Sequence, residues 1–194
     1  MVRSPLFPRW SDTALRVAVA VTVAGIGGAI LGPMIYVRSP FRTGVGTPVD
    51  QPVQFDHRHH VQDDGIDCRY CHESVERSAS AGIPATEVCM NCHSQVWADS
   101  PLLEPVQRSY FSGQSLPWQR VYQLPDFVYF HHGIHIARGF ACPACHGAVD
   151  TMPVIEQASP LTMAWCLDCH RNPQRHLAEP RPVRSLTHCT TCHR

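Results

Sequence analysis

The stretch Cys68-Arg69-Tyr70-Cys71-His72 is one of five copies of Cys-x-x-Cys-His, and together the copies use every cysteine in the chain. The first to fifth motifs, numbered in chain order, are residues 68–72, 89–93, 142–146, 166–170 and 189–193. Cys-x-x-Cys-His is the signature of c-type haem attachment: two thiols bond the two vinyl groups of one haem, and the histidine binds its iron. The sequence therefore predicts five covalently bound haem c groups.

The motifs define two sets of binding residues. The thioether-forming residues are Cys68, Cys71, Cys89, Cys92, Cys142, Cys145, Cys166, Cys169, Cys189 and Cys192. The proximal iron ligands are His72, His93, His146, His170 and His193. A zinc ribbon or a disulfide framework would also use paired cysteines, but neither requires a histidine after every pair. Electron transfer is the function that this haem density predicts, and no catalytic site is expected.

The composition excludes some partners and some chemistry. The 194 residues carry no formal net charge and have a pI near 7.2, so nothing indicates nucleic acid binding. All sixteen basic residues are arginine, whose planar fork suits pairing with haem propionates. Genomic base composition is an equally good explanation of that bias. Because lysine is absent, a catalytic haem with a lysine ligand is impossible.

Residues 17–37, VAVAVTVAGIGGAILGPMIYV, contain no charged side chain. A helix of this length would be about 32 Å long, which is enough to cross a bilayer core. We expect a single membrane-spanning helix in contact with lipid, because no small-x-small cleavage site of a signal peptide ends the run. Covalent haem attachment takes place outside the bacterial cytoplasmic membrane. This predicts a periplasmic haem domain and a cytoplasmic N-terminus, residues 1–16.

An internal repeat organises the rest of the chain. Phe55-Asp56-His57-Arg58-His59-His60 and Phe130-His131-His132-Gly133-Ile134-His135 share the pattern Phe-x-His-x-x-His, and each precedes two attachment motifs. We expect a linker at 38–54, dihaem modules at 55–96 and 130–175, an intermodule segment at 97–129 and a fifth-haem segment at 176–194. Seventeen prolines limit long helices, so the predicted fold is mainly helical and irregular, organised around haems, with few strands.

Eight further histidines compete for the distal side of five irons. The repeats nominate His57, His60, His132 and His135, because residues three apart on a helical turn share a face and can serve two nearby irons. His59 and His131 are expected to be bystanders. The fifth distal ligand is one of Met163, His176 and Met152, and a methionine would give that haem a higher potential. His188 directly precedes the fifth motif, and whether it can reach an iron is left open.

The Phe-x-His-x-x-His…Cys-x-x-Cys-His pattern resembles the modules of class III cytochromes c and cytochromes c7. That resemblance implies that His57 serves the haem of the first motif and His132 the haem of the third, while His60 and His135 reach other haems. A resemblance over nearly the whole chain is to the pentahaem cytochrome c subunit of bacterial alternative complex III. Residues 116–147 (LPWQRVYQLPDFVYFHHGIHIARGFACPACHG), 160–173 (PLTMAWCLDCHRNP) and 189–194 (CTTCHR) carry it.

The second resemblance implies a function and partners. That complex oxidises membrane quinol, and its haem subunits relay electrons to a soluble periplasmic acceptor or to an oxidase. The expected partners are an iron–sulfur subunit, polytopic quinol-binding subunits and a monohaem cytochrome. The chain itself would be an electron-transfer subunit of a quinol:acceptor oxidoreductase.

Two other functions compete with the relay. An independent quinol dehydrogenase of the NapC/NrfH type also has one membrane helix and several c haems. However, about thirty residues separate the expected helix from the first motif here, and that type places its first haem close to the membrane. A multihaem reductase would need an iron with an open position. Eight spare histidines for five irons argue against one.

Overall fold

The computed structural model describes residues 7–177, 179 and 181–194, and it divides into two compact units. The first unit ends at Thr43 and contains the helices α1 (Trp10–Tyr36) and α2 (Pro40–Thr43). The second unit is Gly44–Arg194 and contains all five attachment motifs.

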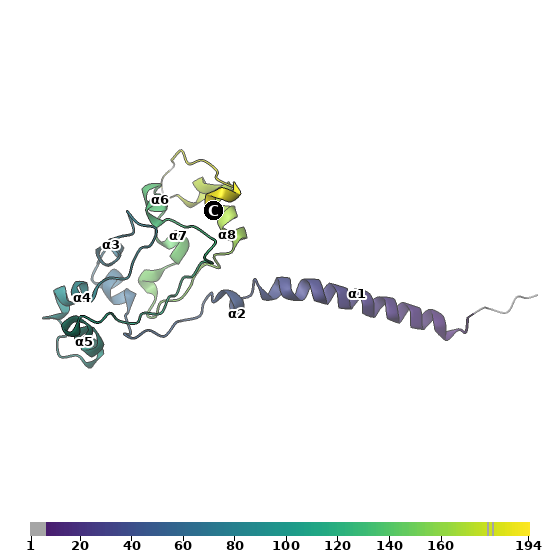
Figure 1. Ribbon diagram of the computed structural model, residues 1–194, viewed down its shortest axis with the longest axis horizontal. Coiled ribbons are helices and arrows are strands. Elements are labelled where there is room, and N and C mark those ends of the chain that lie inside the picture. Colours follow the sequence, from purple (N-terminus) through teal and green to yellow (C-terminus); the bar gives the residue numbers. More distant parts are fainter. Residues whose placement is uncertain (1–6, 178, 180) are drawn as a thin grey trace, which may run out of the picture. The chain divides into compact units, whose positions relative to one another are not determined.

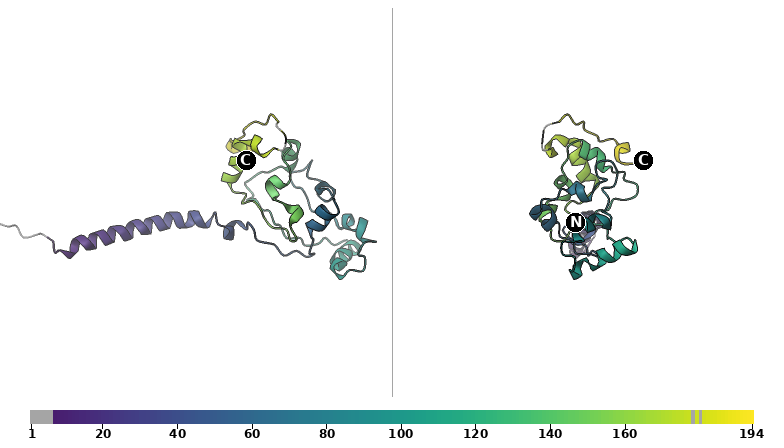
Figure 2. Two further views of the ribbon diagram at one scale, coloured as in Figure 1. Left: turned by 180° about the vertical axis from the view of Figure 1, so that it is seen from behind. Right: turned by 90° about the vertical axis from the view of Figure 1, so that its left-hand side faces the viewer.

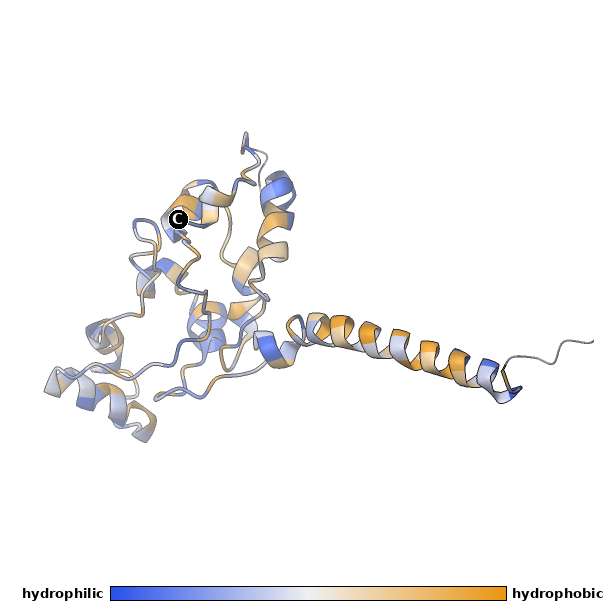
Figure 3. Ribbon diagram, turned by 45° about the vertical axis from the view of Figure 1, so that its right-hand side comes forward, coloured by the Kyte–Doolittle hydropathy of each residue, from blue (hydrophilic) through white to orange (hydrophobic). Residues whose placement is uncertain are grey.

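The first unit is dominated by α1, which has 27 residues and no buried side chain. Figure 3 shows apolar residues along nearly its whole length. It is long and apolar enough to cross a membrane. The helix begins seven residues before the charge-free run 17–37, and its first turns include the ion pair between Arg16 and Asp12, 2.9 Å apart and one turn from each other.

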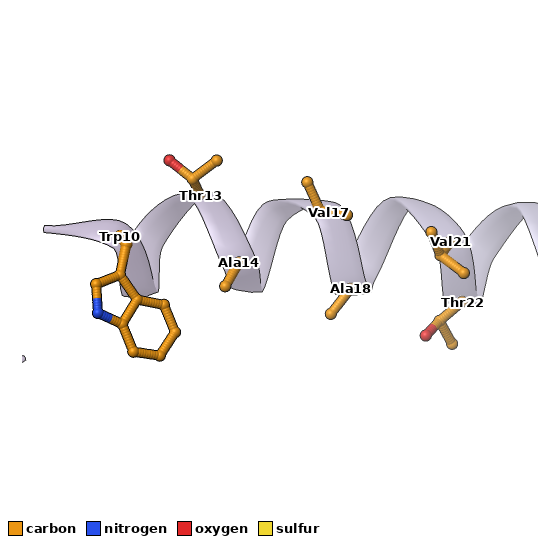
Figure 4. Close-up of a pocket in the computed structure, with 7 residues that line it drawn as sticks. All are labelled: Trp10, Thr13, Ala14, Val17, Ala18, Val21 and Thr22. Carbon is orange, nitrogen blue, oxygen red and sulfur yellow. The ribbon is translucent and has the colours of Figure 1, made fainter. Parts of the chain in front are cut away.

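One flank of the N-terminal half of α1 is lined mostly by small side chains, as Figure 4 shows. The residues along it are Trp10, Thr13, Ala14, Val17, Ala18, Val21 and Thr22. Tryptophan is enriched at membrane–water interfaces, where its amphipathic ring sits at the level of the lipid headgroups. Trp10 at the start of the helix fits that position.

The second unit consists of short helical segments joined by long irregular stretches (Figure 1). In chain order they are η1 (Arg58–Asp63), α3 (Cys68–Cys71), α4 (Thr86–His93), η2 (Pro101–Leu103), α5 (Glu104–Ser112), α6 (His132–Ala137), α7 (Pro143–His146), η3 (Val149–Thr151), α8 (Met163–Arg171), η4 (Pro173–His176) and α9 (Cys189–Cys192). The described residues form no strand, only the isolated bridges Val45–Gln157 and Pro48–Glu156. The predicted fold class, mainly helical and irregular, is confirmed.

The polypeptide core of this unit is small and lies between α4 and α5, which are side by side in Figures 1 and 2. Val53, Met90, Leu103 and Val106 form it, and Cys89 of the second motif packs against it. The segment 97–129 therefore supplies a helix that covers the helix of the second motif. Elsewhere in the unit the described residues bury few apolar side chains, so attached haems would contribute much of the apolar interior.

The two repeats meet where α6 approaches the loop that follows the first motif. The amide of Gly133 donates to the carbonyl of Ser78 (3.1 Å), and the amide of His132 donates to that of Ala79 (3.3 Å). A Cβ atom at position 133 would lie 2.6 Å from the carbonyl oxygen of Glu76. Only glycine allows this approach between the repeats without a backbone shift.

We therefore expect Gly133→Ala to lower the free energy of unfolding by about 1–3 kcal/mol, the usual cost of inserting a carbon into a tightly packed site. Urea unfolding of the haem-loaded protein, followed by far-ultraviolet circular dichroism, would measure the change. Ile134→Ala is the matched control, because Ile134 lies next to Gly133 and is 58% exposed. Equal stability of the two variants would contradict the steric constraint.

Candidate haem centres

Each attachment motif contains or forms a helical turn. In the first, third and fifth motifs, the histidine amide donates to the carbonyl of the first cysteine, at 2.9, 3.0 and 2.9 Å respectively. The second and fourth motifs lie in α4 and α8. Because residues three apart share a helix face, both thiols of a motif point to the same side, as attachment to one haem requires. All ten cysteines lie in the described part of the chain, and none forms a disulfide.

Four of the five motif histidines share one backbone contact. The Nδ1 atom of each lies within hydrogen-bonding distance of a backbone carbonyl: His72 with Gly82 (2.8 Å), His93 with Val96 (2.9 Å), His170 with Leu186 (2.9 Å) and His193 with Phe127 (3.0 Å). A carbonyl only accepts, so Nδ1 must carry the proton. The lone pair is then on Nε2, which is free to bind a metal.

The two Phe-x-His-x-x-His repeats adopt the same local geometry. Phe55 meets His57 edge-on (ring centroids 4.8 Å apart) and stacks on His60 (4.3 Å). Phe130 meets His132 edge-on (4.7 Å) and stacks on His135 (4.5 Å). The phenylalanine therefore sets the angle between the two imidazoles in each repeat. Sequence reasoning missed this role, although the phenylalanine recurs at the same position in both copies.

In three of these four histidines, Nδ1 also lies within hydrogen-bonding distance of a backbone carbonyl. The acceptors are Asp56 for His60 (2.9 Å), Ala79 for His132 (2.8 Å) and His131 for His135 (2.9 Å). The Nδ1 atom of His57 is instead buried without a protein partner among the described residues. His60, His132 and His135 thus have Nε2 available to bind a metal, as the motif histidines do.

The repeat histidines face motif histidines across a regular gap. Ring centroids are 6.1 Å apart for His60 and His93, 6.2 Å for His132 and His146, and 6.1 Å for His135 and His170. Metal–nitrogen bonds to imidazole are about 2 Å long and the ring centre lies about 1 Å further, so two imidazoles sharing one iron have centroids about 6 Å apart. The three measured gaps fit an iron between the rings.

Electrostatics favour the neutral imidazoles that iron ligation needs. Burial, reinforced by the nearby His72 and then His60, lowers the pKa of His57 to about 4. Burial also lowers the pKa of His146 to about 4, with His132 and then His72 adding to the effect. A histidine with so low a pKa is uncharged at neutral pH and keeps its lone pair.

The remaining histidines are differently placed. His59 is half exposed, stacks on Trp97 (centroids 5.7 Å apart) and lies 3.6 Å from Asp63 and 3.8 Å from Asp64. His131 contributes its carbonyl to His135, while its own Nδ1 is buried without a partner among the described residues. The bystander role of His59 and His131 stays a prediction; the buried, unpartnered Nδ1 of His131 matches that of His57.

The fifth motif has no facing imidazole of this kind among the described residues. Phe127 stacks on His193 (centroids 5.9 Å apart), and the amide of Tyr129 donates to the carbonyl of Cys192 (2.8 Å). His176 and His188 are exposed. Met163 starts α8 and is 68% exposed. Met152 is partly buried, with its Cε 3.6 Å from where a Cβ on Gly147 would lie.

Tyr122 was also missed by the sequence analysis. Its ring meets His146 edge-on (centroids 4.4 Å apart), and its hydroxyl accepts from the amide of Ala158 (2.9 Å) and lies 3.3 Å from the carbonyl of His146. It therefore holds the third motif against residues 156–158. No sequence pattern marks it, because the contact joins segments that are far apart along the chain.

Comparison with known proteins agrees with this geometry. The model of the family "cytochrome c7 and related cytochrome c" matches residues 53–106 and 128–194. The chain belongs to this family. Each matched range begins two residues before a Phe-x-His-x-x-His repeat. Membership in a cytochrome c family implies covalently bound haem c, and the paired thiols and facing imidazoles fit that group.

One relative of this cytochrome is the multiheme cytochrome c subunit of menaquinone reductase from Nitratidesulfovibrio vulgaris (strain Hildenborough). The two are 37% identical over 98 residues, which make up 50% of this chain and 46% of that protein. The chain thus spans about half the length of the curated relative that it matches.

The pairing of His60 with His93 can be tested by comparing two neighbouring histidines of the cytochrome. We expect His60→Ala to remove one ligand from one iron and so convert one haem from low spin to high spin, because His60 faces His93. We expect His59→Ala, the matched control one residue away, to leave every haem low spin. Ultraviolet–visible spectra and low-temperature electron paramagnetic resonance (EPR) would measure both. A fully low-spin His60→Ala protein would refute the pairing.

Proposed function

We propose that the chain is a membrane-anchored pentahaem cytochrome that relays electrons from quinol oxidation within a membrane complex. The observation that carries this proposal is the set of facing imidazole pairs with gaps near 6 Å. Three irons would be held between these pairs and a fourth between His72 and the buried His57, and such irons have no open position for a substrate. This supports conduction over catalysis.

The proposed residue roles follow the geometry. The ten motif cysteines hold the five haems, and the five motif histidines are their proximal ligands. The distal ligands are His57 with His72, His60 with His93, His132 with His146 and His135 with His170. A bound haem supplies reversible one-electron transfer at its iron.

The chain's own groups orient the ligands and keep them neutral. Backbone carbonyls hold Nδ1–H of seven of these histidines, which fixes the ring orientation and aims Nε2 at the metal. Phe55 and Phe130 cover one face of the rings that they stack on. Burial keeps the pKa of His57 and His146 far below neutral pH, so protons do not compete with iron for them.

We further propose the dihaem modules 55–96 and 130–175, the fifth-haem segment 176–194, and an α1 anchored in the bacterial cytoplasmic membrane with the haem domain in the periplasm. The helix α1 and the resemblance to the pentahaem subunit of alternative complex III support this placement. The relative is a subunit of a menaquinone reductase, which supports partners in a quinol-linked complex. These would be an iron–sulfur subunit, polytopic quinol-binding subunits and a monohaem cytochrome, with electrons leaving to a periplasmic acceptor or an oxidase.

Purification from native membranes in mild detergent tests the relay directly. We expect polytopic membrane subunits and a large iron–sulfur subunit to co-purify, and quinol to reduce the haems in that fraction. Mass spectrometry would identify the subunits, and a quinol-oxidation assay would follow the haem α band. A cytochrome that comes away alone and still accepts electrons from quinol would indicate an independent quinol dehydrogenase of the NapC/NrfH type instead.

For the fifth distal ligand we propose Met163. It lies one helical turn before Cys166 in α8, and the fourth motif adjoins the start of the fifth through the hydrogen bonds between His170 and Leu186. Met152 instead contacts Gly147, next to the third motif, whose iron already has His132 and His146 as candidates. His176, at the end of η4, is exposed as Met163 is, so exposure does not separate them; we prefer the methionine because it would give this haem the higher potential of an exit point.

We therefore expect a methionine-to-iron charge-transfer band in near-infrared magnetic circular dichroism, and its loss in Met163→Leu. One haem should also lose its high potential in that variant, since methionine ligation raises haem potentials. Met152→Leu is the matched control and should keep the band. A band that survives Met163→Leu would exclude Met163.

A further inference from the structure

The positions of the four repeat histidines determine which motifs are neighbours within each repeat. His57 and His60 lie on one helical turn, at the start of η1 and inside it; His60 faces His93, and His57 is the proposed partner of His72. The first and second motifs are therefore adjacent. His132 and His135 lie on one turn of α6 and face His146 and His170. The third and fourth motifs are therefore adjacent in the same way.

The loop 73–82 joins the first motif to the third. Its last carbonyl, on Gly82, holds Nδ1 of His72 (2.8 Å), and its Ala79 carbonyl holds Nδ1 of His132 (2.8 Å). The Ser74 hydroxyl lies 2.9 Å from the Ser80 carbonyl and 2.8 Å from that of Ala81, which keeps the loop compact. One short loop thus orients a ligand on each side. The second motif has no comparable tie to the second repeat among the described residues.

A side-chain contact joins the first motif to the second. The amide of Asn91, inside the second motif, donates to the hydroxyl of Tyr70, inside the first (3.3 Å). The first motif is thus next to the second through this contact and next to the third through the loop 73–82.

The fifth motif adjoins the fourth. Leu186 and His170 exchange two hydrogen bonds: Nδ1 of His170 donates to the Leu186 carbonyl (2.9 Å), and the Leu186 amide donates to the His170 carbonyl (3.3 Å). Leu186 lies three residues before Cys189, where α9 begins. The pair holds the start of the fifth motif beside the proximal ligand of the fourth.

We propose that the five haem-binding motifs form a single row in the order second, first, third, fourth, fifth, so that the second and fifth are its two ends. This proposal rests on the proposed function, because it requires a haem at every motif. It differs from chain order at one decisive place: the first motif is interior and the second is terminal. Each transfer along the row oxidises one ferrous iron and reduces its ferric neighbour by the same electron.

Distal-ligand variants combined with an EPR-monitored redox titration test the order. His60→Met raises the potential of the haem at the second motif, and His57→Met does so at the first. A haem whose midpoint potential has been raised is already reduced when its neighbours titrate. Reduction removes one positive charge from its iron, and this lowers the midpoint potentials of the neighbouring haems. The effect falls with distance, so it is largest for adjacent haems. We expect His60→Met to lower the potential of one other haem, and His57→Met to lower the potentials of two. His59→Met, on the same turn, should shift none.

Different outcomes would contradict the proposed order of the motifs and the proposed function. Two shifted haems in His60→Met and one in His57→Met would overturn the proposed order in favour of chain order. His60→Met alone distinguishes the two orders if His57→Met fails to fold. If methionine does not bind, the changed iron becomes high spin and speeds the electron-spin relaxation of adjacent haems. Pulsed EPR then counts the adjacent haems by their faster relaxation. Fewer than five haems per chain in a pyridine haemochrome assay of the unmodified protein would instead refute the proposed function.

Discussion

The hydrogen bond from a histidine Nδ1–H to a backbone carbonyl is the constraint on which the haem-binding unit depends. It recurs at motif histidines such as His72 and at repeat histidines such as His132. The bond selects one tautomer, fixes the ring orientation and leaves Nε2 for metal. Because the acceptors are main-chain atoms, the path of the irregular loops, more than their side chains, positions the ligands.

This dependence explains how a unit with so little regular structure still fixes the orientation of its histidines. Loop 73–82 has no helix or strand, yet its carbonyls orient ligands in two repeats, and Gly133 lets α6 approach it. The small polypeptide core between α4 and α5 stabilises only the neighbourhood of the second motif. The rest of the interior is organised by facing pairs of histidines and the aromatic rings beside them.

Much of this was predictable from the sequence, because local spacing carries it. Cys-x-x-Cys-His predicts helical turns with both thiols on one face, Phe-x-His-x-x-His predicts two ligands on one turn, and the apolar run predicts α1. The path of the loops was not predictable. The approach of Gly133 to Glu76 and the contact of Tyr122 with His146 join distant segments and leave no periodic signal. The helix α1 also extends beyond the charge-free run at its N-terminal end, where the ion pair of Asp12 with Arg16 interrupts that run without interrupting the helix.

The placement of two ligands on one helical turn has an evolutionary consequence. A substitution that tilts η1 or α6, or that replaces Phe55 or Phe130, moves both imidazoles of that turn together. The two centres of a repeat are then not free to drift in potential independently, and selection acts on them as a linked pair. A change in the potential of one haem alone must act on its motif histidine. The loops that carry the carbonyls of Gly82, Val96 and Leu186 hold these histidines. We expect those loops to diverge most among relatives that work at different potentials.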